Sequence, residues 1–162
     1  MRTAFLLVLL VLAGACGTGR HAPFGFRYSH YRGESIDTFA GTVTKDMVRL
    51  PDTTIALVFT PMELAEVRRA VDRARFDELP DTIWYGRTVA DASGPEPLMQ
   101  IEIQYGRERK SVTVDGSYRK ERITPRSGDE FRRVVAIVNA ARGILKKRPE
   151  YQALPPARGG YL

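Results

Sequence analysis

The most strongly patterned segment of the chain is residues 60–76, TPMELAEVRRAVDRARF, which predicts an amphipathic helix. Thr60 and Glu63 have the spacing of a capping box, in which each side chain accepts a hydrogen bond from the other residue's backbone N–H. Pro61 suits the first helical position. The apolar residues that follow recur at helical spacing along one stripe: Leu64, Val67, Val71 and Ala74. Such a helix must bury its stripe against another layer, and we expect that layer to be a sheet.

Several segments have the period-two alternation or the β-branched composition of strands. Residues 24–32 alternate aromatic with smaller or charged side chains, and residues 99–105 alternate apolar with polar ones. The second pattern continues at Val112 and Val114, which predicts an antiparallel hairpin with one solvated face. Two further strand-like segments are joined by the turn sequence PDT: residues 38–50 and residues 54–59.

A second helix is predicted at residues 127–148, with Ser127 and Glu130 at capping-box spacing and Pro149 as its end. Its apolar face is broad: Phe131, Val134, Val135, Ile137, Val138, Ala141, Ile144 and Leu145. The order of elements is therefore strands, helix, hairpin, helix. We predict an α+β fold with an antiparallel sheet of four or five strands and two helices packed on one face.

The first residues indicate where the chain is sent rather than how it folds. Arg2 gives a positive start, residues 5–13 form an uncharged apolar run, and the small residues Gly14 and Ala15 precede Cys16. This is the layout of a cleavable export signal. The apolar run is too short for a transmembrane helix, which needs about 20 residues.

Within this segment, LAGAC at residues 12–16 resembles the lipobox of bacterial lipoproteins, although Ala13 occupies the position where leucine is commonest. The resemblance implies that the chain is cut before Cys16 and that this thiol is acylated, so that a lipid anchors the protein to a membrane. Gly17 is not the aspartate that often marks retention at the inner membrane, which implies the periplasmic face of an outer membrane. An ordinary signal peptide and a retained segment are the alternatives.

This interpretation divides the chain into four parts: a signal peptide at 1–15, the lipidated cysteine and a tether at 16–23, a single α+β domain at 24–154 and a C-terminal tail at 155–162. Because Cys16 is the only cysteine, the domain has no disulfide and depends on packing for its stability. We expect the tail to dock on the sheet through its apolar residues: Leu154, Tyr161 and Leu162.

The chain is basic, with 25 Lys and Arg residues against 19 Asp and Glu residues and a formal net charge of +6. Loss of Arg2 with the signal peptide removes one positive charge. An exported basic protein meets acidic partners such as anionic lipids, cell-wall polymers or acidic proteins. Export argues against nucleic acid, the usual partner of so basic a chain.

No motif predicts catalysis, a metal site or a cofactor. The two histidines, His21 and His30, have no Cys, Asp or Glu at ligand spacing, and serine-nucleophile and phosphate-binding motifs do not occur. Paired carboxylates need no motif, so an envelope hydrolase acting on glycan or peptide is the alternative function. It requires that two of five carboxylates meet in a cleft: Asp77, Glu78, Asp91, Glu102 and Asp115.

Two segments suit recognition because they place aromatic rings beside cations. The candidate binding residues are Arg27, Tyr28, Tyr31 and Arg32 in FRYSHYR, and Trp84, Tyr85 and Arg87 in TIWYGR. The alternative for the first segment is an edge strand whose aromatic face is core. A third group suits either a membrane-facing patch or the helix dipole: Arg142, Lys146, Lys147 and Arg148.

We therefore expect a membrane-anchored envelope lipoprotein whose domain is a non-enzymatic binding module for an envelope protein or a cell-wall component. A further alternative is a periplasmic inhibitor or chaperone-like module. In that case the polar loop at 86–97, or the tail, would insert into a partner.

Overall fold

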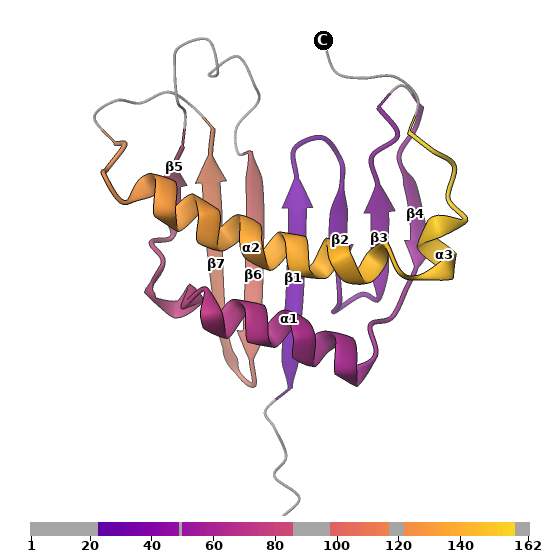
Figure 1. Cartoon of the computed structure of the whole chain (residues 1–162), viewed down its shortest axis with the longest axis horizontal. Helices are drawn as coiled ribbons and strands as arrows, with labels where there is room; N and C mark the ends of the chain where they lie inside the picture. The colour runs from indigo at the N-terminus through magenta and orange to yellow at the C-terminus, as the bar shows by residue number, and fades with distance from the viewer. Residues whose placement is uncertain (1–22, 49, 86–97, 117–121, 158–162) are drawn as a thin grey trace, which may run out of the picture.

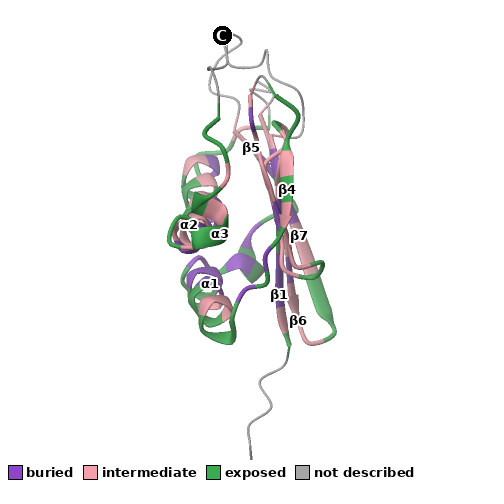
Figure 2. Ribbon diagram, turned by 90° about the vertical axis from the view of Figure 1, so that its right-hand side faces the viewer, coloured by how far each residue is buried: buried purple, intermediate pink, exposed green. Residues whose placement is uncertain are grey.

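A computed structural model of the chain describes residues 23–48, 50–85, 98–116 and 122–157. It has two layers, a single seven-stranded sheet and a layer of helices that covers one face of it (Figures 1 and 2). The long helices are α1 (Pro61–Arg73) and α2 (Ser127–Leu145). The strands are β1 (Phe24–His30), β2 (Ser35–Asp37), β3 (Thr42–Lys45), β4 (Thr53–Ala56), β5 (Thr82–Trp84), β6 (Met99–Tyr105) and β7 (Glu108–Asp115).

The strands lie in the order β4-β3-β2-β1-β6-β7-β5, and every neighbouring pair is antiparallel except β5 and β7, which are parallel. The α+β class is confirmed, but the prediction of four or five antiparallel strands is wrong. The two strands that the sequence did not reveal, β2 and β5, have three residues each, which is too short for alternation to be recognised. Strand β5 is parallel because α1 carries the chain across the sheet from the β4 edge to the opposite edge (Figure 1).

The predicted strand at 38–50 begins late because its first residues form a turn. The Asp37 carboxylate accepts hydrogen bonds from the backbone N–H groups of Phe39 and Ala40, at 2.9 and 3.0 Å. Gly41 has a φ of 65°, which favours glycine. Together these residues reverse the chain between β2 and β3.

Helix α1 begins with the predicted capping box. The Thr60 N–H donates to Glu63 Oε2 at 2.7 Å, and the Glu63 N–H donates to Thr60 Oγ1 at 3.3 Å. Val67 and Val71 are buried against the sheet, as the stripe predicts. A short 3-10 helix, η1 (Phe76–Glu78), follows α1.

Both ends of α2 differ from the prediction. Arg126 is the N-cap and makes no capping hydrogen bond through its side chain, so the expected Ser127–Glu130 capping box is wrong. Ser127 is instead the first helical residue, and its buried hydroxyl accepts a hydrogen bond from the Thr124 N–H at 3.0 Å. At the other end, α2 stops at Leu145, and Pro149 opens the short helix α3 (Pro149–Gln152) instead of ending a helix.

The core lies between the sheet and the helices. Along β6, Met99, Ile101 and Ile103 are buried toward the helices, while the polar residues between them face the other side. This second face has no helix over it in the part of the chain that the structure describes (Figure 2), and we call it the open face. The predicted solvated face of the β6–β7 hairpin is therefore confirmed.

The tail begins beside the sheet. Lys45 Nζ on β3 donates to the Pro155 carbonyl at 2.8 Å, and Leu154 is half-buried. Tyr161 and Leu162 lie outside the described residues, as does the expected signal peptide. Within the described part of the chain, no helix combines the length and the apolar character needed to cross a membrane.

Candidate functional site

The central strand β1 separates the FRYSHYR candidates onto two faces. Tyr28 points toward the helices and is fully buried, so its prediction as a binding residue is wrong. The alternative interpretation is confirmed in part: the aromatic face of the strand, with Phe26 and Tyr28, is core, but β1 lies between β2 and β6 and is not an edge strand. Arg27 occupies the open face, and Tyr31 and Arg32 follow the end of the strand.

Tyr28 belongs to a polar cluster that connects α2 to the β1–β2 turn. Arg142 Nη2 donates to the Tyr28 hydroxyl at 3.0 Å, and Arg142 Nε donates to Glu34 Oε1 at 2.9 Å. A second Arg142 nitrogen donates to Glu34 Oε2, which makes the pair bidentate. Burial raises the pKa of Tyr28, and Glu34 adds to the effect. This cluster is structural, since its members satisfy one another.

Two of the four cationic residues at the end of α2, Arg142 and Arg148, form ion pairs within the domain. Arg148 Nη1 lies 3.1 Å from a Glu63 carboxylate oxygen, and Arg148 Nη2 lies 3.1 Å from Glu150. With Arg142 bound to Glu34, only Lys146 and Lys147 of the four are exposed.

The turn after β1 places an aromatic ring and a cation together. The His30 and Tyr31 rings are 4.7 Å apart between centroids. Arg32 Nε donates to the Tyr31 hydroxyl at 2.6 Å, and its guanidinium carbon lies 5.2 Å from the Tyr31 ring centroid. Burial lowers the pKa of His30, which favours a neutral imidazole in this turn.

The TIWYGR candidates lie at the end of β5, one of the two strands that the sequence did not reveal. Tyr85 stacks on Phe131 of α2 with ring centroids 3.7 Å apart and planes 12° apart. Trp84 is half-buried, and the guanidinium carbon of Arg122 lies 6.0 Å from its ring centroid. Arg87 and the loop at 86–97 lie outside the described residues.

The topology brings these two aromatic segments to the same end of the sheet. Strands β1 and β5 run in the same direction, so Tyr31 and Trp84 both lie where these strands end (Figure 1). Strands β6 and β7 lie between β1 and β5. Tyr31 and Trp84 are therefore three strand spacings apart, roughly 14 Å at about 4.8 Å between neighbouring strands. We call Tyr31, Arg32, Trp84 and Tyr85 the distal end, because residue 23 enters the sheet at the opposite end.

Arg27 belongs to a second cluster, on the open face. Its Nε lies 2.9 Å from Asp37 Oδ2, and its Nη1 lies 3.4 Å from Glu102 Oε2. Arg109 Nη1 approaches the other Glu102 oxygen at 2.9 Å. The two guanidinium carbons lie 5.3 and 5.2 Å from the ring centroid of Phe39. Asp37, Phe39, Glu102 and Arg109 were not among the predicted binding residues, because 75 positions separate Arg27 from Glu102 and nothing local marks the cluster.

Asp37 is held ionised by this cluster. Burial alone raises its pKa, but hydrogen bonds from the Ala40 N–H and the Arg27 guanidinium outweigh burial and lower the pKa overall. The two arginines and the two carboxylates of the cluster therefore neutralise one another.

The described carboxylates of the alternative function are not brought together across the sheet. Glu102 and Asp115 share the open face, but Asp115 is four residues along β7 from Ser111, the partner of Glu102. This is about 13 Å at about 3.3 Å per residue, longer than the roughly 5–9.5 Å between glycosidase carboxyl groups. Asp77 and Glu78 lie in η1 on the helix side, and Asp91 is outside the described residues. Among the residues that the structure describes, no group of three His, Cys, Asp or Glu side chains is placed to hold a metal.

Comparison with models of known protein families finds no match for this chain, and a search of curated proteins finds no significant match either.

Proposed function

We propose that this chain is a lipid-anchored envelope lipoprotein whose α+β domain is a non-enzymatic binding module. Its anchor is the acylated Cys16, and its partner is an envelope protein or a cell-wall component bound at the distal end. The observation that carries this proposal is the arrangement of the two ends of the domain. Residue 23 enters at one end of the sheet, and two separate segments that carry aromatic and cationic residues both lie at the other end (Figure 1).

The distal end has the composition of a recognition surface. Tyr, Trp and Arg are the residues that most often dominate binding energy at interfaces. Tyr31 and Tyr85 are held in place by Arg32 and Phe131, so little conformational entropy is lost when a ligand is bound. Of the candidate carboxylates, Glu102 and Asp115 lie farther apart along the open face than the hydrolase alternative requires.

The anchor is tested by the mass of the mature protein from a lipoprotein-processing bacterium. We expect a chain that starts at Cys16 and carries acyl groups, and we expect Cys16→Ser to be neither acylated nor cut at this site. An unmodified Cys16 in the mature protein would disprove the anchor.

The binding surface is tested by placing a photo-crosslinking residue at Tyr31 or at Trp84 in the anchored full-length protein. We expect both positions to capture the same envelope component, and Cys16→Ser to reduce the capture. Glu66, exposed on α1, is the control position. If Glu66 captures as much as Trp84, the distal end is not the binding surface.

Where no protein is captured, the same proposal predicts that the protein sediments with isolated cell wall. Trp84→Ala is then expected to weaken binding at least tenfold, about 1.4 kcal/mol. Failure of both assays would contradict the binding function.

A further inference from the structure

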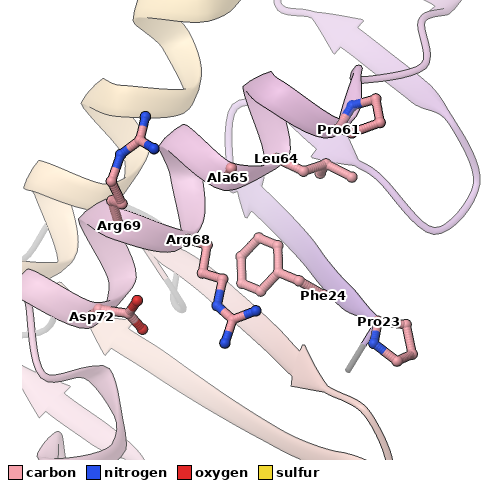
Figure 3. Close-up of a pocket in the computed structure, with 8 residues that line it drawn as sticks. All are labelled: Pro23, Phe24, Pro61, Leu64, Ala65, Arg68, Arg69 and Asp72. Atoms are coloured by element: carbon pink, nitrogen blue, oxygen red, sulfur yellow. The ribbon is translucent and has the colours of Figure 1, made fainter. Parts of the chain in front are cut away.

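The end of the domain where residue 23 enters carries an apolar groove. It has a volume of about 570 Å³ and lies between the start of β1 and the flank of α1 (Figure 3). Pro23, Phe24, Leu64 and Ala65 contribute apolar surface to it. The groove therefore adjoins the point where the proposed tether joins the fold.

Cations line the same groove. Arg68 and Arg69 make no ion pair among the described residues, although the guanidinium carbon of Arg68 lies 5.2 Å from the ring centroid of Tyr105. The carboxylate in the lining, Asp72, accepts a hydrogen bond from the Tyr105 hydroxyl at 2.7 Å. The two arginines are thus available to an external anion.

Exposed apolar side chains gather at this end as well. Four large hydrophobic side chains are exposed in the described part of the chain, and Phe39, Val58 and Met62 are the three at this end. Val58 is 71% exposed and Met62 is 82% exposed. Phe39 and Val58 lie against Gly25 and Gly41, near the start of β1 and of β3, and Met62 follows Pro61 of the groove. The fourth, Leu50, lies between β3 and β4 at the opposite end of the sheet.

We infer that the groove together with Val58, Met62, Arg68 and Arg69, which we call the tether-end surface, contacts the bilayer that holds the anchor. This rests on the proposed acylation of Cys16. The seven residues from Cys16 to Pro23 reach at most about 25 Å when fully extended, so the surface stays close to the lipid headgroups. Apolar side chains then enter the boundary between headgroups and acyl chains, and the arginines bind lipid phosphates.

Tethering makes this contact effective even when the surface itself binds weakly. An anchored surface meets the bilayer at a high effective concentration, so no large apolar area is required. The consequence is an orientation: the tether-end surface lies on the membrane and the distal end points away from it.

The test uses the full-length acylated protein in vesicles of phosphatidylcholine and phosphatidylglycerol that contain a nitroxide lipid. Because the native thiol is acylated, Met62→Cys supplies a single site for a fluorophore. Leu50→Cys, at an exposed hydrophobic residue of the opposite end, is the matched control. We expect the nitroxide to quench position 62 several-fold more than position 50. Equal quenching at the two positions would overturn the inference.

A charge reversal tests the arginines in the same assay. Arg68→Glu with Arg69→Glu is expected to reduce the quenching at position 62. Lys146→Glu with Lys147→Glu makes the same change in net charge at two exposed lysines elsewhere and is expected to leave it unchanged. Equal effects of the two double variants would assign the attraction to net charge and not to this surface.

Flotation of the vesicles and the mass of the protein separate the two proposals. A protein that is acylated and floats, yet shows no quenching at position 62, refutes the membrane contact and leaves the anchor standing. A protein that is not acylated refutes the anchor and the contact together.

Discussion

At the scale of single residues, Gly25 shows how one missing side chain shapes the open face. A Cβ on this residue would lie 2.1 Å from Cε1 of Phe39, well inside contact distance. The absence of that atom lets the Phe39 ring lie on β1, where Arg27 and Arg109 flank it. Glycine is otherwise unfavourable inside a strand, so its presence here is explained by the ring.

Gly25→Ala is therefore expected to destabilise the protein by about 1–3 kcal/mol, the usual range for overpacking. In a Phe39→Ala background the same change is expected to be neutral or slightly stabilising, because the clash is gone and alanine is the better strand residue. Urea unfolding of the four proteins in the cycle measures the coupling. Additive effects of the two substitutions would show that the ring does not depend on Gly25.

At the scale of elements, Glu63 connects the start of α1 to the end of α2. Its carboxylate accepts from the Thr60 N–H within the capping box and also binds Arg148 beyond α2. Burial by itself raises the pKa of Glu63, but the hydrogen bonds from Thr60 and Arg148 outweigh burial and lower it overall. The ionised form is thus favoured in the folded state.

This pKa shift predicts how stability depends on pH. Because the folded pKa lies below the unfolded value of about 4.3, the stabilisation is present at neutral pH and is lost as the pH falls below about 4. Glu63→Gln is expected to lower stability at pH 7 by about 1 kcal/mol and to flatten this part of the pH profile. Thermal unfolding between pH 3 and 7 measures both effects.

The control for this experiment is Glu66→Gln on the same helix. Glu66 is exposed and makes no ion pair among the described residues. Its substitution is expected to leave the profile as it is in the parent protein. A parent-like profile in Glu63→Gln would mean that Glu63 does not connect the two helices.

At the scale of the whole molecule, the sheet combines a well-paired centre with weak edges. Strand β1 is paired on both sides, by β2 and β6, and its helix-facing residues Phe26 and Tyr28 are fully buried. Strand β4 is an edge strand of four residues, and Thr54 and Ala56 in it are exposed. Stability should therefore decrease from β1 and β6 toward β4.

Hydrogen–deuterium exchange tests this gradient. Amides of β1 and β6 are expected to exchange about a hundredfold or more slowly than those of β4, because only global unfolding exposes the central pair. Exchange of β4 at the rate of β1 would contradict the gradient and would indicate that the sheet opens as one unit.

Some features of this protein follow from local sequence alone. The capping box of α1 depends on Thr60 and Glu63, three residues apart, and the solvated face of the β6–β7 hairpin depends on alternation within two short segments. The expectation of an anchored protein rests in the same way on residues 12–16. Each of these signals is local, because every atom involved lies within a few residues of its partner.

The tertiary structure alone decided the rest. The three-residue strands β2 and β5 form by pairing with neighbours, and the sequence has too few residues there to carry a pattern. Strand β1 is central and not an edge strand, and Glu102 meets Arg27 and Arg109 only across paired strands. The aromatic segments that follow β1 and β5 lie at one end of the domain because these two strands run in the same direction in the sheet. Long-range pairing sets which residues share a face or an end, and local periodicity carries no information about it.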